Sequence, residues 1–139
     1  MSGDRRLRAL RVIERVKEQD TERSARAAAE LRSRIEALEA TRAELLHRIT
    51  RESRIEGLEG AAYLGQFIRA IRAEVERVQH QIDELTPARQ KAEDALRDAL
   101  AEQKTYEILR LRRLADNRRD AARRDTARQD EIARLRWQR

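Results

Sequence analysis

The sequence predicts an all-α fold in which the whole chain, residues 1–139, forms one long antiparallel two-helix coiled-coil hairpin with a projecting C-terminal helix. Two stretches carry large apolar residues at alternating spacings of four and three, which places each set along one narrow seam of a helix. Charged residues make up 42% of the chain and aromatic residues 3%, and there is one proline, which is typical of long paired helices. A short glycine-rich break separates the stretches and lets the chain reverse.

The first stretch predicts a helix over about residues 4–56. Its second half carries a strong seam and its N-terminal half a weaker one. The strong seam comprises Leu31, Ile35, Leu38, Arg42, Leu45 and Ile49, and the weaker one comprises Leu7, Leu10, Val12, Ile13 and Val16. Small residues follow the weaker seam and bury little apolar area, so we expect the terminal half of the hairpin to be held less firmly than the half near the turn.

The turn is expected at about residues 57–62 and the second helix at about residues 62–137. Its seam comprises Leu64, Ile68, Ile71, Val75, Val78, Ile82 and Leu85. Thr86 and Pro87 interrupt the pattern, so the helix either restarts or bends there, and continued helical spacing favours a bend. Beyond Pro87 the seam weakens to Arg89, Ala92, Leu96 and Ala99, and we expect it to shift in phase to Ile108, Leu111 and Ala115.

The register of the hairpin follows from aligning its two strong seams. Laying Ile49 against Ile68 and Leu31 against Leu85 places residue 1 opposite about residue 116. The last stretch of the chain then projects as a single helix of roughly 30 Å. A rod that buries only one seam is expected to be marginally stable alone and to gain stability from a partner.

Positive charge is concentrated at the two ends of the chain. Residues 110–139 hold 11 arginines and 5 acidic residues, and residues 1–17 hold 6 basic and 2 acidic residues. In an antiparallel hairpin both segments lie at the same end, where they form a candidate surface for an acidic partner. The candidate residues are Arg5, Arg6, Arg8, Arg11, Arg118, Arg119, Arg123, Arg124 and Arg128.

No motif for catalysis, a cofactor or a metal is present, so an enzyme is not expected. The chain lacks phosphate-binding glycine motifs and has no cysteine, and the expected register keeps His47 and His80 too far apart to share a metal. Aspartates at regular intervals interrupt the arginine-rich tail and repel phosphates. We therefore expect only non-specific attraction to nucleic acid, and no sequence-specific binding.

Aromatic residues mark two further positions. Tyr63 and Phe67 follow the break and lie beside the seam, where they either close the end of the hairpin or form an exposed contact for a partner. Trp137 lies near the end of the arginine-rich tail. It belongs either to a frayed terminus or to an anchor that docks in a partner.

Three short motifs, in this order, resemble the FliJ family of the bacterial flagellar type III export apparatus, and its alphaproteobacterial members most. Residues 63–68 (YLGQFI) are similar to the family's aromatic residue followed by Gln-Phe-Ile. Lys104, Glu107 and Leu109 are similar to its Lys-x-x-Glu-x-Leu. Residues 130–133 (DEIA) are similar to its closing Asp-Glu-Ile-Ala.

The resemblance implies a non-enzymatic stalk whose termini enter the pore of a hexameric export ATPase and whose turn region faces the cytoplasmic domain of the membrane export gate. It also implies contact with export chaperones, and a cytoplasmic location peripheral to the cell membrane at the flagellar base. Phe67, Ile71 and Val78 would then contact the gate, with Tyr63 beside them, although the first helix has no aromatic residue to share that contact. The alternatives are the stalk of a virulence type III secretion system and a self-associating structural coiled coil.

Overall fold

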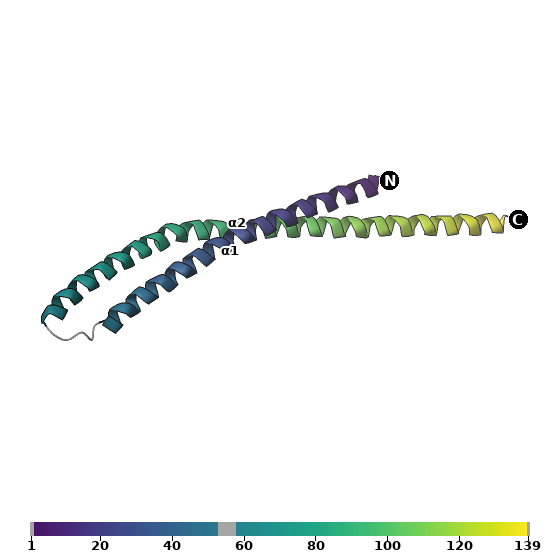
Figure 1. Ribbon diagram of the computed structural model, residues 1–139. Helices are drawn as coiled ribbons and strands as arrows, with labels where there is room; N and C mark the ends of the chain where they lie inside the picture. The colour runs from purple at the N-terminus through teal and green to yellow at the C-terminus, as the bar shows by residue number, and fades with distance from the viewer. Residues whose placement is uncertain (1, 53–57, 139) are drawn as a thin grey trace. The chain divides into compact units, whose positions relative to one another are not determined.

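The computed structural model describes residues 2–52 and 58–138, which form two long helices, α1 (Ser2–Glu52) and α2 (Leu58–Trp137). The chain divides into two units, and each pairs a segment of α1 with a segment of α2 that runs in the opposite direction (Figure 1). The terminal unit comprises Met1–Glu22 and Arg97–Arg139, and the central unit comprises Arg23–Leu96. The predicted all-α fold with two helices packed against each other is thus confirmed.

The helix bounds differ somewhat from those expected from the sequence. Helix α2 begins at Leu58, so that Gly60 and the two alanines after it, which we expected in the turn, lie in its first turns. Helix α1 ends at Glu52. Residues 53–57, which include the end of the expected first helix and the start of the expected turn, lie outside the described residues.

Helix α2 passes through Pro87 without a break, so the helix does not restart there. Proline has no backbone N–H, and the carbonyl group of Asp83 therefore loses the amide partner it would have in a regular helix. The Thr86 hydroxyl donates a hydrogen bond to the Ile82 carbonyl oxygen at 2.7 Å. The same i to i−4 bond satisfies the hydroxyls of Thr21, Thr41, Thr105 and Thr126, which keeps these threonines compatible with a helix.

The core of the central unit consists of the two strong seams. Buried and half-buried side chains from α1 and α2 pack against one another along it. The buried ones are Ile35, Leu45, Ile71, Val78 and Ile82, and the half-buried ones are Leu38, Ile49, Phe67, Val75 and Leu85. Arg42, the polar residue in the predicted seam, donates a hydrogen bond to the Gln79 side chain across the interface. The seam prediction is confirmed for this unit.

In the terminal unit the seam predicted for α1 was right for Leu7 and Leu10 and wrong for the other three residues. Leu7 is buried and Leu10 half-buried as expected, but Val12 is 63% exposed, and Ile13 and Val16 are also exposed. The half-buried positions are instead Glu14 and Lys17, which continue the four-three spacing from Leu10. In an unbroken helix the strong seam fixes the phase, and apolar residues outside that phase stay at the surface.

The predicted phase shift in α2 was wrong for the same reason. Ile108 and Leu111 are exposed, whereas Tyr106, Arg110 and Arg113 are half-buried. These three residues continue the spacing that passes through Arg89, Ala92, Leu96, Ala99 and Gln103. The α2 seam therefore keeps one phase but becomes polar as it enters the terminal unit.

Candidate protein-interaction surfaces

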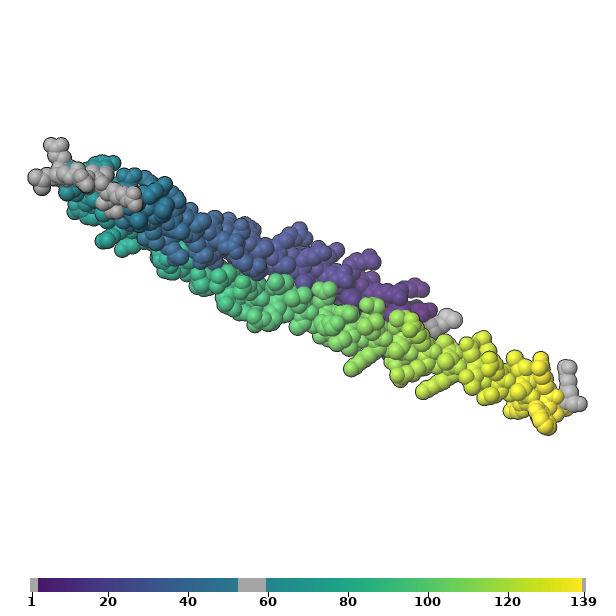
Figure 2. Space-filling model, turned by 90° about the horizontal axis from the view of Figure 1, so that it is seen from below, coloured from purple at the N-terminus to yellow at the C-terminus, as the bar shows by residue number. Residues whose placement is uncertain are grey.

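The terminal unit brings the basic residues of both chain ends together. Figure 2 shows the purple start of α1 lying against the yellow-green segment of α2. A Cβ atom added at Gly3 would lie 2.6 Å from Asn117 Oδ1, so the backbone of α1 runs close to α2 at this point. All nine predicted basic residues are exposed here: Arg5, Arg6, Arg8, Arg11, Arg118, Arg119, Arg123, Arg124 and Arg128. Together they give the terminal unit a surface of high positive charge density.

Helix α2 carries only exposed side chains over its last turns. Every residue from Ala122 to Gln138 is exposed, including three of the basic candidates. Trp137 is 90% exposed, and Ile132 and Leu135 are exposed as well. This segment of α2 therefore offers both arginine side chains and a few apolar ones to a partner.

Ion pairs hold α1 and α2 together at the polar seam positions of the terminal unit. Arg110 donates two hydrogen bonds to the Glu14 carboxylate, at 2.5 Å from Nε and 3.5 Å from Nη2. The hydrogen bond to Glu14 raises the pKa of Arg110. Lys17 Nζ donates to Glu102 Oε2 at 2.8 Å and lies 5.8 Å from the centre of the Tyr106 ring. These contacts take the place of the apolar packing found in the central unit.

Near the start of α2 the structure separates the four predicted gate-contacting residues. Tyr63 is 61% exposed and stacks on Phe67, with ring centres 6.4 Å apart. Phe67 is half-buried, packs against the core and has the Arg48 guanidinium 5.6 Å from its ring centre. Ile71 and Val78 are buried in the core between the helices. Of the four, Tyr63 is therefore exposed at the surface and Phe67 is only partly accessible.

Within residues 2–52 and 58–138, no group of three metal-ligating side chains comes together. None of the helices described carries a stretch apolar enough to cross a lipid bilayer. His80 lies 3.0 Å from the Glu84 carboxylate on the exposed face of α2. The features that single out regions of this molecule are therefore charge and exposed apolar side chains.

Sequence reasoning missed one feature, the apolar residues that face solvent beside the seam of the terminal unit. On α1 these are Ile13 and Val16, and on α2 they are Leu100 and Leu109. The signal was available, because each of them falls outside the four-three spacing. Ile13 and Val16 belong to the weaker seam predicted for α1, and Leu100 and Leu109 belong to no predicted seam.

Comparison with known families matches nearly the whole chain to one of them. The model of the FliJ family, described as the flagellar FliJ protein, matches residues 6–139. No curated protein and no solved structure gives a significant match.

Proposed function

The chain belongs to the FliJ family of flagellar export proteins, and we propose that it is a non-enzymatic stalk and adaptor of the flagellar type III export apparatus. In this proposal the terminal unit enters the hexameric export ATPase, and the start of α2 contacts the cytoplasmic domain of the membrane export gate. Export chaperones are further partners. The protein then works in the cytoplasm, at the inner face of the membrane beneath the flagellum.

The observation that carries the proposal is that both basic chain ends lie in the terminal unit, with all nine candidate arginines exposed. Such a surface attracts an acidic ring over a distance and orients the rod before close contact. Each exposed ion pair between an arginine and an acidic residue of the partner adds little affinity. The attraction therefore depends on all the arginines together and on ionic strength.

The last segment of α2 extends this surface in the proposal. We infer that residues 122–138 project from the hairpin as a single helix, about 25 Å long at the rise of an α-helix. Full exposure of all these side chains supports this arrangement. A single helix with arginines and an exposed Trp137 suits insertion into a narrow pore.

For the gate, the proposal rests on Tyr63 and Phe67. The rings of these two residues stack on each other. Tyrosine is among the residue types that contribute most to the binding energy of protein interfaces. Ile71 and Val78 are accessible to a partner only if the two helices separate, because both are buried between them. The gate contact should therefore be sensitive to Tyr63→Ala and Phe67→Ala.

The ATPase contact is tested by measuring the affinity of the full chain for the purified export ATPase hexamer at several salt concentrations. The triple variant Arg118→Ala, Arg119→Ala and Arg123→Ala should bind more weakly and show a smaller dependence on salt. The matched control is the triple variant Arg69→Ala, Arg72→Ala and Arg77→Ala, which removes three exposed arginines from the central unit. Equal affinities and equal salt dependences for the two variants would contradict the proposal.

Self-association is the second candidate function, because exposed apolar residues such as Leu100 and Leu111 could pack against a second copy. The stalk of a virulence type III secretion system has the same form as a flagellar stalk. The genes that neighbour the gene for this chain would distinguish the two systems. Sedimentation equilibrium of the purified chain should give a monomer for a stalk of either system. A stable dimer or tetramer at micromolar concentration would favour the structural coiled coil.

A further inference from the structure

Two grooves of different chemistry flank the seam of the terminal unit. One lies among residues that directly follow seam positions of α1, and it is charged: Arg11, Glu14, Arg15, Glu18 and Arg110 line it. The other lies among residues that directly precede seam positions on both helices, and its lining includes Ala9, Leu10 and Leu109. Because neighbouring heptad positions fall on opposite edges of a seam, the two grooves lie on opposite flanks of the helix pair.

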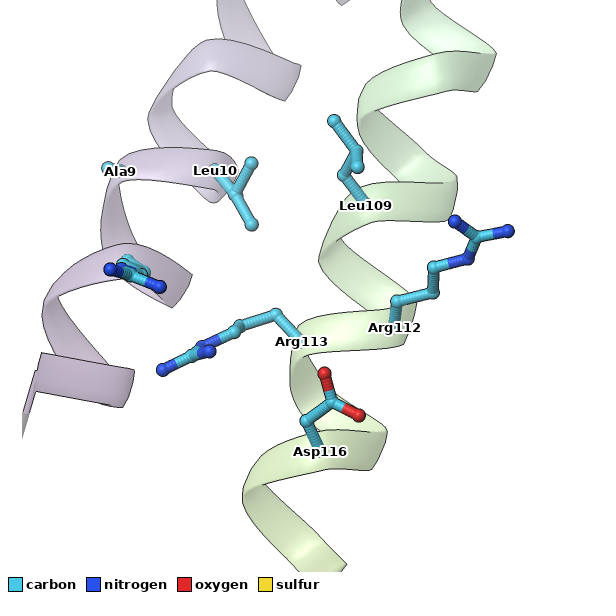
Figure 3. Close-up of a pocket in the computed structure, with 7 residues that line it drawn as sticks. Ala9, Leu10, Leu109, Arg112, Arg113 and Asp116 are labelled. Carbon is cyan, nitrogen blue, oxygen red and sulfur yellow. The ribbon is translucent and has the colours of Figure 1, made fainter.

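The second groove, here called the apolar groove, has a volume of about 430 Å³. Figure 3 shows Leu10 of α1 and Leu109 of α2 on the facing sides of the two helices, with Arg113 reaching toward α1. Leu109 is 39% exposed. Ile13 and Val16 also precede seam positions of α1 and are exposed, so they extend the same apolar flank.

Positively charged residues lie beside these leucines. Arg6, Arg112 and Arg113 line the groove, and Asp116 is the acidic residue among its lining. Within the residues that the structure describes, Arg6 and Arg112 form no ion pair. Nε of Arg113 is buried and has no hydrogen-bond partner. The groove therefore combines one exposed leucine, Leu109, and one half-buried leucine, Leu10, with guanidinium groups that lack carboxylate partners.

We propose that the apolar groove is the docking site for an acidic amphipathic segment of the export ATPase ring. An apolar side chain of that segment packs on Leu10 and Leu109, and a carboxylate beside it pairs with Arg112 or Arg113. Arginine binds carboxylates through two parallel hydrogen bonds, which fixes the orientation of the bound segment. This inference rests on the proposed function, since it takes the ATPase as the partner of the terminal unit.

Charge decides against the other possible occupants. A second copy that docked symmetrically through this groove would bring the same arginines against one another, and like charges that face each other at an interface repel. The chain's own tail carries Arg123, Arg124 and Arg128 and meets the same repulsion. An acidic segment with an apolar residue complements both the leucines and the arginines that line the groove.

Two leucines of α2 provide a matched test. Leu109 precedes the seam position Arg110 and lines the apolar groove, whereas Leu111 follows Arg110 and lies on the other flank. Their exposures are similar, 39% and 47%, so that Leu109→Gln and Leu111→Gln should affect folding alike. Leu109→Gln should weaken binding of the full chain to the purified ATPase hexamer about tenfold, and Leu111→Gln less than about twofold.

A second pair tests the charge. Arg112→Ala should weaken binding and Arg112→Lys should restore it only partially, because lysine lacks the paired donors of arginine. Arg15→Ala, in the charged groove, is the control. Wild-type chain that does not bind the hexamer would overturn both this inference and the proposed function. Wild-type binding that survives Leu109→Gln, or is lost equally in both leucine variants, would overturn the groove alone.

Discussion

Lys17 shows how a polar side chain holds a seam position of a coiled coil. Its ammonium group donates a hydrogen bond to Glu102 and lies over the Tyr106 ring, both from the facing helix. A charge at such a position contributes specificity of pairing more than stability, because water competes for it and burial is slight. Glu14 and Arg110 form an equivalent cross-helix pair a single helical turn away.

The pKa of Lys17 should lie above the ordinary lysine value of 10.5, mainly because of the hydrogen bond to Glu102 and then because of the negative charge of that carboxylate. The contribution of the pair to stability is then fully present below pH 10.5 and is lost as the pH rises through the folded-state pKa. Titration of the Lys17 side-chain carbon resonances by NMR measures this pKa. The Glu102→Gln variant should lower it, and an unchanged pKa in that variant would show that Glu102 is not the cause.

Ile71 and Val78 should behave as core residues in unfolding experiments. Ile71→Ala removes a buried side chain from the central core and should cost about 2–4 kcal/mol of unfolding free energy. Tyr63→Ala and Ile132→Ala, at exposed positions, should each cost less than about 1 kcal/mol. Urea unfolding followed by circular dichroism measures all three. Equal costs at the buried and exposed positions would mean that the core is not formed as described.

At the scale of the helix, prediction from sequence succeeded where the seam is strong. The apolar residues of the central unit, from Ile35 to Ile82, define one phase in each helix, and the structure has that phase. In the terminal unit, Val12 and Val16 suggested a different face from the one that Glu14 and Lys17 occupy. Residue type alone is a poor guide there. The helix is continuous, so the strong seam of the central unit also determines which residues of the terminal unit face the other helix.

One of the two candidate sites in the terminal unit was predicted from the sequence and the other was not. Joining of the two basic ends follows from antiparallel pairing alone, and the structure has both in the terminal unit. The apolar groove was missed, because the predicted phase shift obscured which leucine lies on which flank of the seam. Leu109 and Leu111 differ by two positions in sequence yet lie on opposite flanks, and only the correct phase separates them.

Replacement of Pro87 by alanine should stabilise the hairpin. Helix α2 is unbroken at this position, Pro87 is exposed, and proline costs up to about 3 kcal/mol in a helix interior. Alanine restores an N–H group that can donate to the Asp83 carbonyl, although it also loosens the unfolded chain, so we expect a gain of about 1–2 kcal/mol in unfolding free energy. Urea unfolding of the variant beside the wild type measures the change. A loss of stability would instead mean that the helix needs the bend that proline produces at this point.

For the molecule as a whole, the two units differ in how they are held together. Among the residues described, Leu7 is the one buried apolar side chain of the terminal unit, while the central unit has a continuous apolar core. Regions with few buried apolar contacts open at low free-energy cost. A unit of this kind can adjust to a partner, and a partner that binds its folded form stabilises it.

Hydrogen exchange should reveal this difference directly. In the free chain, backbone amides of α1 in the terminal unit, residues 6–22, should exchange at least about tenfold faster than those of residues 30–49 in the central unit, because opening the ionic seam exposes little apolar surface. Addition of the purified export ATPase hexamer should slow exchange in residues 6–22 and in the facing segment of α2, and leave the central unit unchanged. The Leu109→Gln variant should lose most of this added protection, whereas Leu111→Gln should keep it. Uniform exchange along α1 in the free chain would mean that the polar seam is as stable as the apolar one. The terminal unit would then not be the less stable part of the molecule that a partner stabilises.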